Sequence, residues 1–200
     1  MSVATPPLGR RERQKQAKLE RITAAASELF AKHGVDDVTT QQIADAADIG
    51  TGTLFLYAKT KGELLLLVQN AHYAEALERG RAAAARESTA VDAILALLAP
   101  VAECNRVQVD NGRTYLREMV FGDPSEPHHA AALSIVAQTE EAVAGILTEK
   151  AGLPAAQAET LARVASAIQF VVLGASVNTG SSISELLADI RAQVAAILPR

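Results

Sequence analysis

The sequence predicts an all-α protein, on three observations. Alanine and leucine, the strongest helix formers, dominate this chain of 200 residues, in which β-branched residues are comparatively sparse. Apolar residues recur at helical spacing rather than in the two-residue alternation of half-buried strands. Polar helix-starting residues and helix-ending glycines then divide the chain into segments of helical length.

Charge is distributed unevenly along the chain. The formal net charge is −4, yet the first 21 residues carry six basic and two acidic side chains, and the first 65 carry nine basic and eight acidic ones. The remainder of the chain is therefore acidic. A basic N-terminal part suits contact with nucleic acid, although such a run by itself equally suits a solvated tail.

The first expected helix follows a proline-rich start. Residues 1–9 lack periodicity, so we expect them to be disordered. A helix is then expected over residues 13–33, because apolar side chains recur on one face of it. That face comprises Leu19, Ile22, Ala26, Leu29 and Phe30. Gly34 follows at the position where a glycine cap would end the helix.

Two short helices and a long one come next. Thr39 and Gln42 have the three-residue spacing of a capping box and open the first short helix. A brief turn leads to the second, over about residues 51–57. Thr60 and Glu63 repeat the capping-box spacing and open a helix of roughly 39 Å, at ~1.5 Å per residue.

Five further helices are predicted in the rest of the chain. Ser182 and Glu185 give the last of them a capping box. We expect Pro100 to kink the first and a turn at Asn111-Gly112 to precede the second. The expected ranges are 89–109, 113–121, 127–150, 154–178 and 182–198.

The two short helices, backed by the first, have the order of a helix-turn-helix, whose second helix enters the major groove of DNA. Thr51, Gly52 and Thr53 are small, so the start of that helix can approach base edges and phosphates closely. Hydroxyl and cationic side chains flank it and suit phosphate contacts. The residues predicted to contact DNA are Thr39, Thr40, Gln41, Gly50, Thr51, Gly52, Thr53, Phe55, Tyr57, Lys59 and Lys61.

The segment from residue 21 to residue 65 carries a specific pattern. Its members are Arg21-Ile22, Ala25-Ala26, Leu29-Phe30, Gly34, Thr39-Thr40, Ile43-Ala44, Ala47, Ile49, Gly52-Thr53-Leu54, Tyr57, Lys61 and Glu63-Leu64. In order and spacing this segment resembles the DNA-binding region of the TetR/AcrR family of transcriptional regulators. The resemblance covers under a quarter of the chain.

Three positions depart from the family's pattern. Thr51 stands where the family usually has a basic residue, Phe55 where it has tyrosine, and Ala58 where it has phenylalanine. The first two departures remove side chains that could contact phosphate. The third removes bulk between the recognition helix and the long helix.

The resemblance implies the organisation of the whole chain. It predicts a disordered basic arm over residues 1–12, a helix-turn-helix domain over 13–60, and a helical ligand-binding and dimerisation domain over 61–200. It implies a repressor that leaves its double-stranded DNA operator when a small, largely apolar molecule binds, without a cofactor. The candidate ligand-binding residues are Cys104, Gln108, Tyr115, Met119 and Gln169.

Apolar stripes at helical spacing mark the last two predicted helices. They comprise Ala165, Ile168, Val172 and Ala175, followed by Leu186, Leu187, Ile190, Val194 and Ile197. The resemblance implies that these helices pair with their copies in a homodimer. The pattern by itself equally allows the stripes to pack inside one subunit.

Two other classes of function are weaker fits. A helical enzyme or cofactor-binding bundle needs convergent ionisable residues, and a metal site needs matched ligands, but the adjacent His128 and His129 point about 100° apart on a helix. A protein-interaction module would leave the basic arm and the small helix start without a purpose. With one cysteine, Cys104, and no run of ~18 uninterrupted apolar residues, we expect a cytoplasmic protein without membrane contact.

Overall fold

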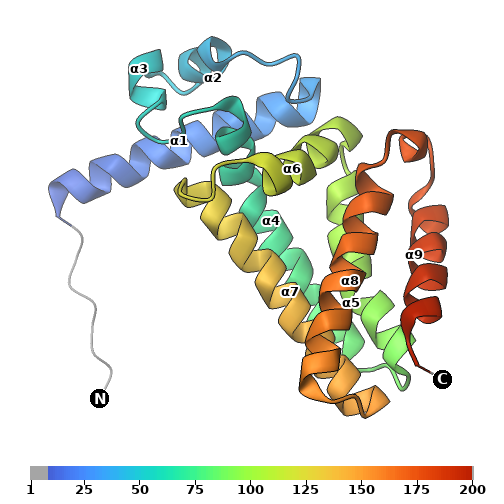
Figure 1. Ribbon diagram of the computed structural model, residues 1–200. Coiled ribbons are helices and arrows are strands. Elements are labelled where there is room, and N and C mark those ends of the chain that lie inside the picture. Colours follow the sequence, from blue (N-terminus) through green and yellow to red (C-terminus); the bar gives the residue numbers. More distant parts are fainter. Residues whose placement is uncertain (1–8, 200) are drawn as a thin grey trace.

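The computed structural model describes residues 9–199, which fold into nine α-helices and one short 3₁₀ helix, with no strand among them (Figure 1). The all-α prediction is confirmed. The helices are α1 (Arg10–His33), α2 (Thr40–Ala46), α3 (Thr51–Leu54), α4 (Lys61–Ala84), α5 (Ala90–Arg106), α6 (Val109–Phe121), α7 (Pro127–Ala151), α8 (Ala155–Gly174), η1 (Ser176–Asn178) and α9 (Ile183–Ile197).

The three N-terminal helices form a head around a small apolar core. Ile22 and Phe30 of α1, Ile43 of α2 and Leu54 of α3 are almost completely buried, and Leu64 near the start of α4 joins them. Burial of such side chains contributes roughly 1.5–3 kcal/mol each. The beginning of α4 is therefore part of the head, while the rest of this helix runs into the bundle (Figure 1).

The body is a bundle in which α4, α5, α7, α8 and α9 surround an aliphatic core. Leu77, Leu97 and Ile190 lie fully inside it. α4 and α5 lie close together at Gly80, where a methyl group would lie 2.2 Å from the carbonyl oxygen of Leu97. Packing therefore requires a glycine at this position, although glycine is a poor helix former.

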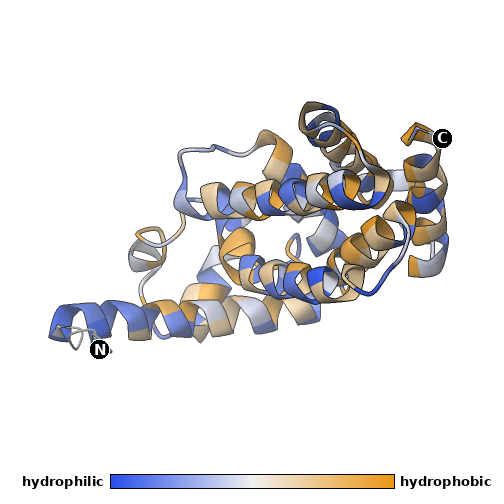
Figure 2. Cartoon of the chain, turned by 90° about the horizontal axis from the view of Figure 1, so that it is seen from below, coloured by the Kyte–Doolittle hydropathy of each residue, from blue (hydrophilic) through white to orange (hydrophobic). Residues whose placement is uncertain are grey.

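α1 begins at Arg10, three residues before the predicted start. Arg10, Arg11 and Glu12 are therefore helical, and the predicted disordered arm is wrong for these residues; residues 1–8 lie outside the described part of the chain. Figure 2 shows the first turns of α1 as hydrophilic. They carry no apolar stripe to reveal the helix, but arginine, glutamate, glutamine and lysine are all good helix formers.

The predicted turn at Asn111-Gly112 is wrong, because both residues lie inside α6. The side chain of Gln108 caps this helix by accepting from the Asn111 backbone N–H at 2.6 Å. The Asn111 side chain accepts from the Val35 N–H at 2.7 Å. A methyl group at Gly112 would lie 2.0 Å from a carbonyl oxygen of α5, so these two turn-forming residue types serve tertiary contacts instead.

The remaining helix boundaries differ by a few residues. α3 ends at Leu54, after which backbone bonds continue as looser turns to Ala58. α8 ends at Gly174, and only the short η1 continues toward Asn178. Thr89 caps α5, and Pro100 lies within that helix. These ends depend on local competition between caps, which apolar periodicity does not report.

Among the described residues, α7 alone is long and apolar enough to cross a membrane by length and composition. Glu140 and Glu141 lie near its middle. A charged side chain at the centre of a membrane helix costs roughly 3 kcal/mol. In this fold α7 packs between α4 and α8.

Candidate functional site

Polar contacts at the first turns hold α2 and α3 in place. The Thr39 side chain accepts from the Gln42 N–H at 3.2 Å, and the Thr39 N–H donates to Gln42 Oε1 at 2.8 Å, which confirms the predicted capping box. The Thr51 hydroxyl donates to Gln41 Oε1 at 2.7 Å and so connects the two helices. Asp48 closes the turn between them in the left-handed region, with φ of 52°.

The residues predicted to contact DNA are exposed or half-buried. A methyl group at Gly50 or Gly52 would meet nothing within 4 Å, so the backbone at the start of α3 is open to an approaching partner. Beside it lie two exposed apolar side chains, Phe55 and Leu56, at 43% and 83%. Leu56 was not predicted as a surface residue of interest, because helical periodicity is lost where α3 gives way to turns.

Two side chains of this segment contact α1 or the loop that follows it. The Tyr57 hydroxyl donates to the Lys15 carbonyl at 3.3 Å. Lys61 Nζ donates to the Asp36 carbonyl at 3.0 Å. These contacts hold the α2–α3 segment on α1, and both side chains stay half-exposed.

The end of the helix-turn-helix also contacts the corner between α6 and α7. Lys59 pairs with Glu126, whose carboxylate raises the pKa of the lysine. The Thr60 hydroxyl caps α4 by accepting from the Glu63 N–H at 3.0 Å. The Glu63 side chain does not complete the predicted capping box; it is 5% exposed and faces α7.

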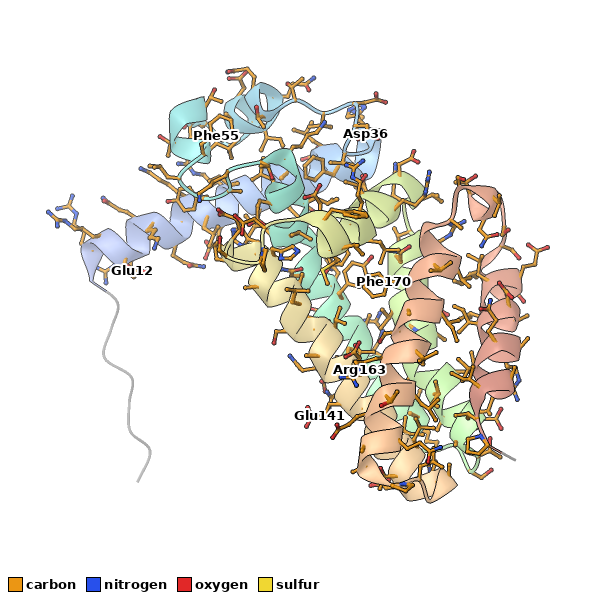
Figure 3. All side chains as sticks on the ribbon, in the orientation of Figure 1. Glu12, Asp36, Phe55, Glu141, Arg163 and Phe170 are labelled. Carbon is orange, nitrogen blue, oxygen red and sulfur yellow. The ribbon has the colours of Figure 1, made fainter. Side chains whose placement is uncertain are left out.

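An inner cavity of about 40 Å³ lies in the body, walled by α4, α5, α6, α7 and α8. Its apolar lining includes Val101, Ile135 and Phe170, and Figure 3 shows Phe170 projecting from α8 into the bundle. Its polar lining residues are Tyr73, Asn105, Tyr115, Thr139, Ser166 and Gln169. Within the described chain, every polar residue in this lining is uncharged.

Two tyrosines form the head-proximal side of the inner cavity. The rings of Tyr73 and Tyr115 stack with centroids 4.1 Å apart and planes 17° apart. Burial raises the pKa of both hydroxyls, so both stay neutral. Asn105 donates to the Tyr73 hydroxyl at 2.8 Å, and its buried Oδ1 has no hydrogen-bond partner among the described residues.

Comparison with known proteins shows which of them share this arrangement of helices. The family model "Bacterial regulatory proteins, tetR family" matches residues 22–68, the segment that contains α2 and α3. The structure of a TetR family transcriptional repressor, FadR from Thermus thermophilus in complex with lauroyl-CoA, matches with a TM-score of 0.71 at 26% identity, over 91% of this chain and 96% of that one. The chain belongs to the TetR family of transcriptional regulators.

Other solved structures share the fold of this TetR-family regulator at lower identity. A TetR transcriptional regulator from Rhodococcus sp. RHA1 matches with a TM-score of 0.68 at 20% identity, over 92% of this chain and 97% of that one. FadR from Bacillus subtilis in complex with stearoyl-CoA matches with a TM-score of 0.61 at 17% identity, over 90% and 99%. No curated protein matches the sequence.

The five candidate ligand residues of the regulator separate in space. Tyr115 and Gln169 line the inner cavity. Cys104 and Gln108 instead line an outer groove of about 360 Å³ between α1, α4, α5 and the start of α6. Met119 is buried but lines neither space.

The helical geometry explains this separation. Val101 and Asn105, four residues apart, point into the inner cavity from α5, so Cys104 is turned away from it by about 100°. Burial raises the pKa of the Cys104 thiol, which therefore stays protonated. Met119 lies one turn beyond Tyr115 along α6 and joins the apolar cluster of the head.

The apolar stripes of α8 and α9 lie mostly inside the subunit. The most buried residues of these two stripes, all 3% exposed or less, are Ala165, Val172, Leu186, Ile190 and Val194. The outward face of α8 instead presents Val164 and Val171, exposed at 39% and 68%. Apolar periodicity does not distinguish the two faces of α8, because the buried face and the exposed face both carry apolar residues.

Proposed function

We propose that this regulator is a homodimeric repressor that leaves its operator when a small molecule with an uncharged, largely apolar body enters the inner cavity. The observation that carries this proposal is the position of the cavity beside α4. This helix borders the cavity at Tyr73 and belongs to the head core at Leu64. Movement of the cavity wall therefore reaches the head through one rigid element.

The DNA contacts are proposed for the exposed residues of α2, α3 and the flanking turns. Gly50 and Gly52 leave the α3 backbone open, and Thr40, Gln41 and Thr53 lie on the accessible side of the two short helices. Small residues at a helix start allow close approach to the major groove. The proposed functional division is therefore a DNA-binding domain over residues 13–60 and a ligand-binding and dimerisation domain over 61–200, with the start of α4 shared between their cores.

The dimer interface is proposed for the outward faces of α8 and α9. Val164, Ile168 and Val171 form a stripe on α8, and Ala188 and Ala192 continue it on α9 with small exposed side chains. Small and apolar residues permit close helix packing in a symmetric interface. Two heads must then meet successive major grooves about 34–36 Å apart.

The ligand class follows from the cavity lining. Without a cation in that lining, an anionic group placed inside would be desolvated without a partner. An acyl chain fits this requirement if its polar end stays outside, and two structural neighbours were solved with lauroyl-CoA and stearoyl-CoA. Lauroyl-CoA is therefore the first probe.

The test begins with selection of a binding site from random double-stranded DNA, using the intact protein. We expect a near-palindromic site, and we expect lauroyl-CoA or an uncharged apolar compound to lower the affinity for it in fluorescence anisotropy. Calorimetry with and without operator must then show the same coupling factor from both directions, since coupling between two binding equilibria is reciprocal. Failure to enrich any sequence would overturn the proposed function.

A further inference from the structure

His128, at the start of α7, binds the DNA-binding head through its side chain and α4 through its backbone. Its Nε2 lies 2.9 Å from the Tyr57 carbonyl oxygen, and because a carbonyl only accepts, this nitrogen carries the proton. Its backbone carbonyl accepts from Asn70 Nδ2 at 2.9 Å. Burial raises the pKa of the Glu63 carboxyl, and the nearby His128 partly opposes this.

The inner cavity lies at the other end of the same set of hydrogen bonds. The Tyr115 hydroxyl donates to Asn70 Oδ1 at 2.9 Å. Tyr115 is 4% exposed and its ring lines the cavity, stacked on Tyr73. An unbroken series therefore leads from Tyr115 through Asn70 and His128 to the backbone of Tyr57, where the turns after α3 end.

The small size of the cavity makes this series sensitive to a ligand. Ligand sites usually measure about 300–1,000 Å³, whereas this cavity measures about 40 Å³. A bound molecule must therefore displace part of the wall. Tyr115 belongs to α6, and its hydroxyl cannot stay on Asn70 if its ring moves by more than a fraction of an ångström, because hydrogen bonds weaken steeply with distance and angle.

We propose that Asn70 and His128 are positioning residues that couple the inner cavity to the recognition segment. With the cavity empty, Tyr115 holds Asn70, Asn70 holds the His128 carbonyl, and the imidazole holds the Tyr57 carbonyl. A ligand that displaces Tyr115 releases this series and frees the end of the recognition segment. The inference rests on the proposed function and names the residues that perform its switch.

Two conservative variants test the two ends of the series in the ligand-free protein. Tyr115→Phe removes one hydroxyl and keeps the stacked ring, and His128→Phe removes the donor and keeps a ring of similar size. Each is expected to weaken operator binding about tenfold, within the ~5–150-fold range of allosteric coupling. The double variant is expected to lose no more than either single variant, because one break already releases the series.

Tyr73→Phe is the matched control. It also removes one hydroxyl from the cavity wall, but Tyr73 accepts from Asn105 and stands outside the series. Its loss of operator affinity should be several-fold smaller than that of Tyr115→Phe, because the bonds from Asn70 to the Tyr57 carbonyl stay intact. Should His128→Phe fail to fold by circular dichroism, Asn70→Ala replaces it in the same double-variant comparison.

The outcomes separate the coupling from the proposed function. Three outcomes would each overturn the coupling. They are unchanged operator binding by Tyr115→Phe, equal losses of operator affinity in Tyr115→Phe and Tyr73→Phe, and losses of affinity that multiply in the double variant. In all three cases the parent still binds its selected site, so the regulator's function stands. A parent that enriches no site overturns the proposed function itself.

Discussion

Glu63 belongs to the first turn of α4, and its side chain faces α7. Its backbone N–H is capped by Thr60 at the start of α4, and its carboxyl group faces the first turn of α7, close to His128. Its Oε2 is buried without a hydrogen-bond partner among the described residues. A buried acceptor that is only partly satisfied reduces stability when it is ionised.

Glu63→Gln should therefore change how stability depends on pH. Burial raises the folded-state pKa of this carboxyl above its ordinary value of 4.5, so the folded protein holds the proton more tightly than the unfolded chain. The parent's stability from this group is complete below pH 4.5 and is lost as the pH rises through the folded-state pKa.

Urea unfolding of parent and Glu63→Gln across pH 4–7 measures this effect. We expect the free energy of unfolding of the parent, relative to the variant, to fall as the pH rises. A difference that is constant with pH would show that Glu63 titrates alike in the folded and unfolded states.

At the scale of helices, close approach of backbones determines how α4 meets α5. Gly80 is buried against the Leu97 carbonyl, whereas a methyl group at Gly145, inside α7, would meet nothing within 4 Å. Both are glycines in helix interiors, so they share the same propensity term and differ in packing alone.

Gly80→Ala and Gly145→Ala should consequently shift stability in opposite directions. Overpacking at Gly80 should cost about 1–3 kcal/mol. The change at Gly145 should stabilise by roughly 0.5–1 kcal/mol, since alanine is the better helix former. Thermal and urea unfolding of both variants measure this, and equal effects would contradict the close α4–α5 crossing.

The start of α1 is a charged, exposed helix rather than a flexible arm. Arg10, Arg11 and Arg13 lie within one turn and are exposed. A preformed basic helix beside the α2–α3 surface can follow the DNA backbone with little ordering cost.

Replacing these three arginines with glutamine should flatten the salt dependence of operator binding. Each lost phosphate contact lowers the slope of log K against log salt by about 0.9. Anisotropy titrations between 50 and 200 mM salt, chosen as roughly the range over which such contacts are felt, measure the slope. Arg86→Gln, in the turn after the far end of α4, is the control for the loss of a positive charge elsewhere. An unchanged slope in the triple variant would exclude α1 from DNA contact.

At the scale of the whole molecule, the dimer proposed above predicts that the outward faces of α8 and α9 bring two heads together. Val171 is 68% exposed in the single chain, whereas Ile190 is fully buried within it. Charge at these two positions should therefore have different consequences, although both belong to apolar helices.

Val171→Glu should yield a folded monomer, and Ile190→Glu should not fold. Loss of the second half-site contact should weaken operator binding by about 10²–10⁴-fold, the usual contribution of linked binding sites. Light scattering and circular dichroism separate the two outcomes, with Leu133→Glu on α7 as the control for an exposed apolar position. A Val171→Glu dimer would place the interface elsewhere.

Local patterns in the sequence predicted the helices of the head, apart from the first turn of α1 and the end of α3, and they predicted the TetR-type segment that the family model matches. The capping boxes at Thr39 and Ser182 form as predicted, and Gly34 ends α1 at the predicted place. Such caps join residues three or four positions apart, so their chemistry can be read without knowledge of the rest of the fold.

Tertiary structure alone decided which side of each body helix faces the cavity, the core or the surface. Asn111 and Gly112 have the composition of a turn, but contacts with α1 and α5 place them in α6. Periodicity selects an apolar face only when the opposite face is polar, and α8 is apolar on both. Which of its faces is buried therefore depends on neighbours distant in sequence, and so do the cavity lining and the hydrogen bonds through His128.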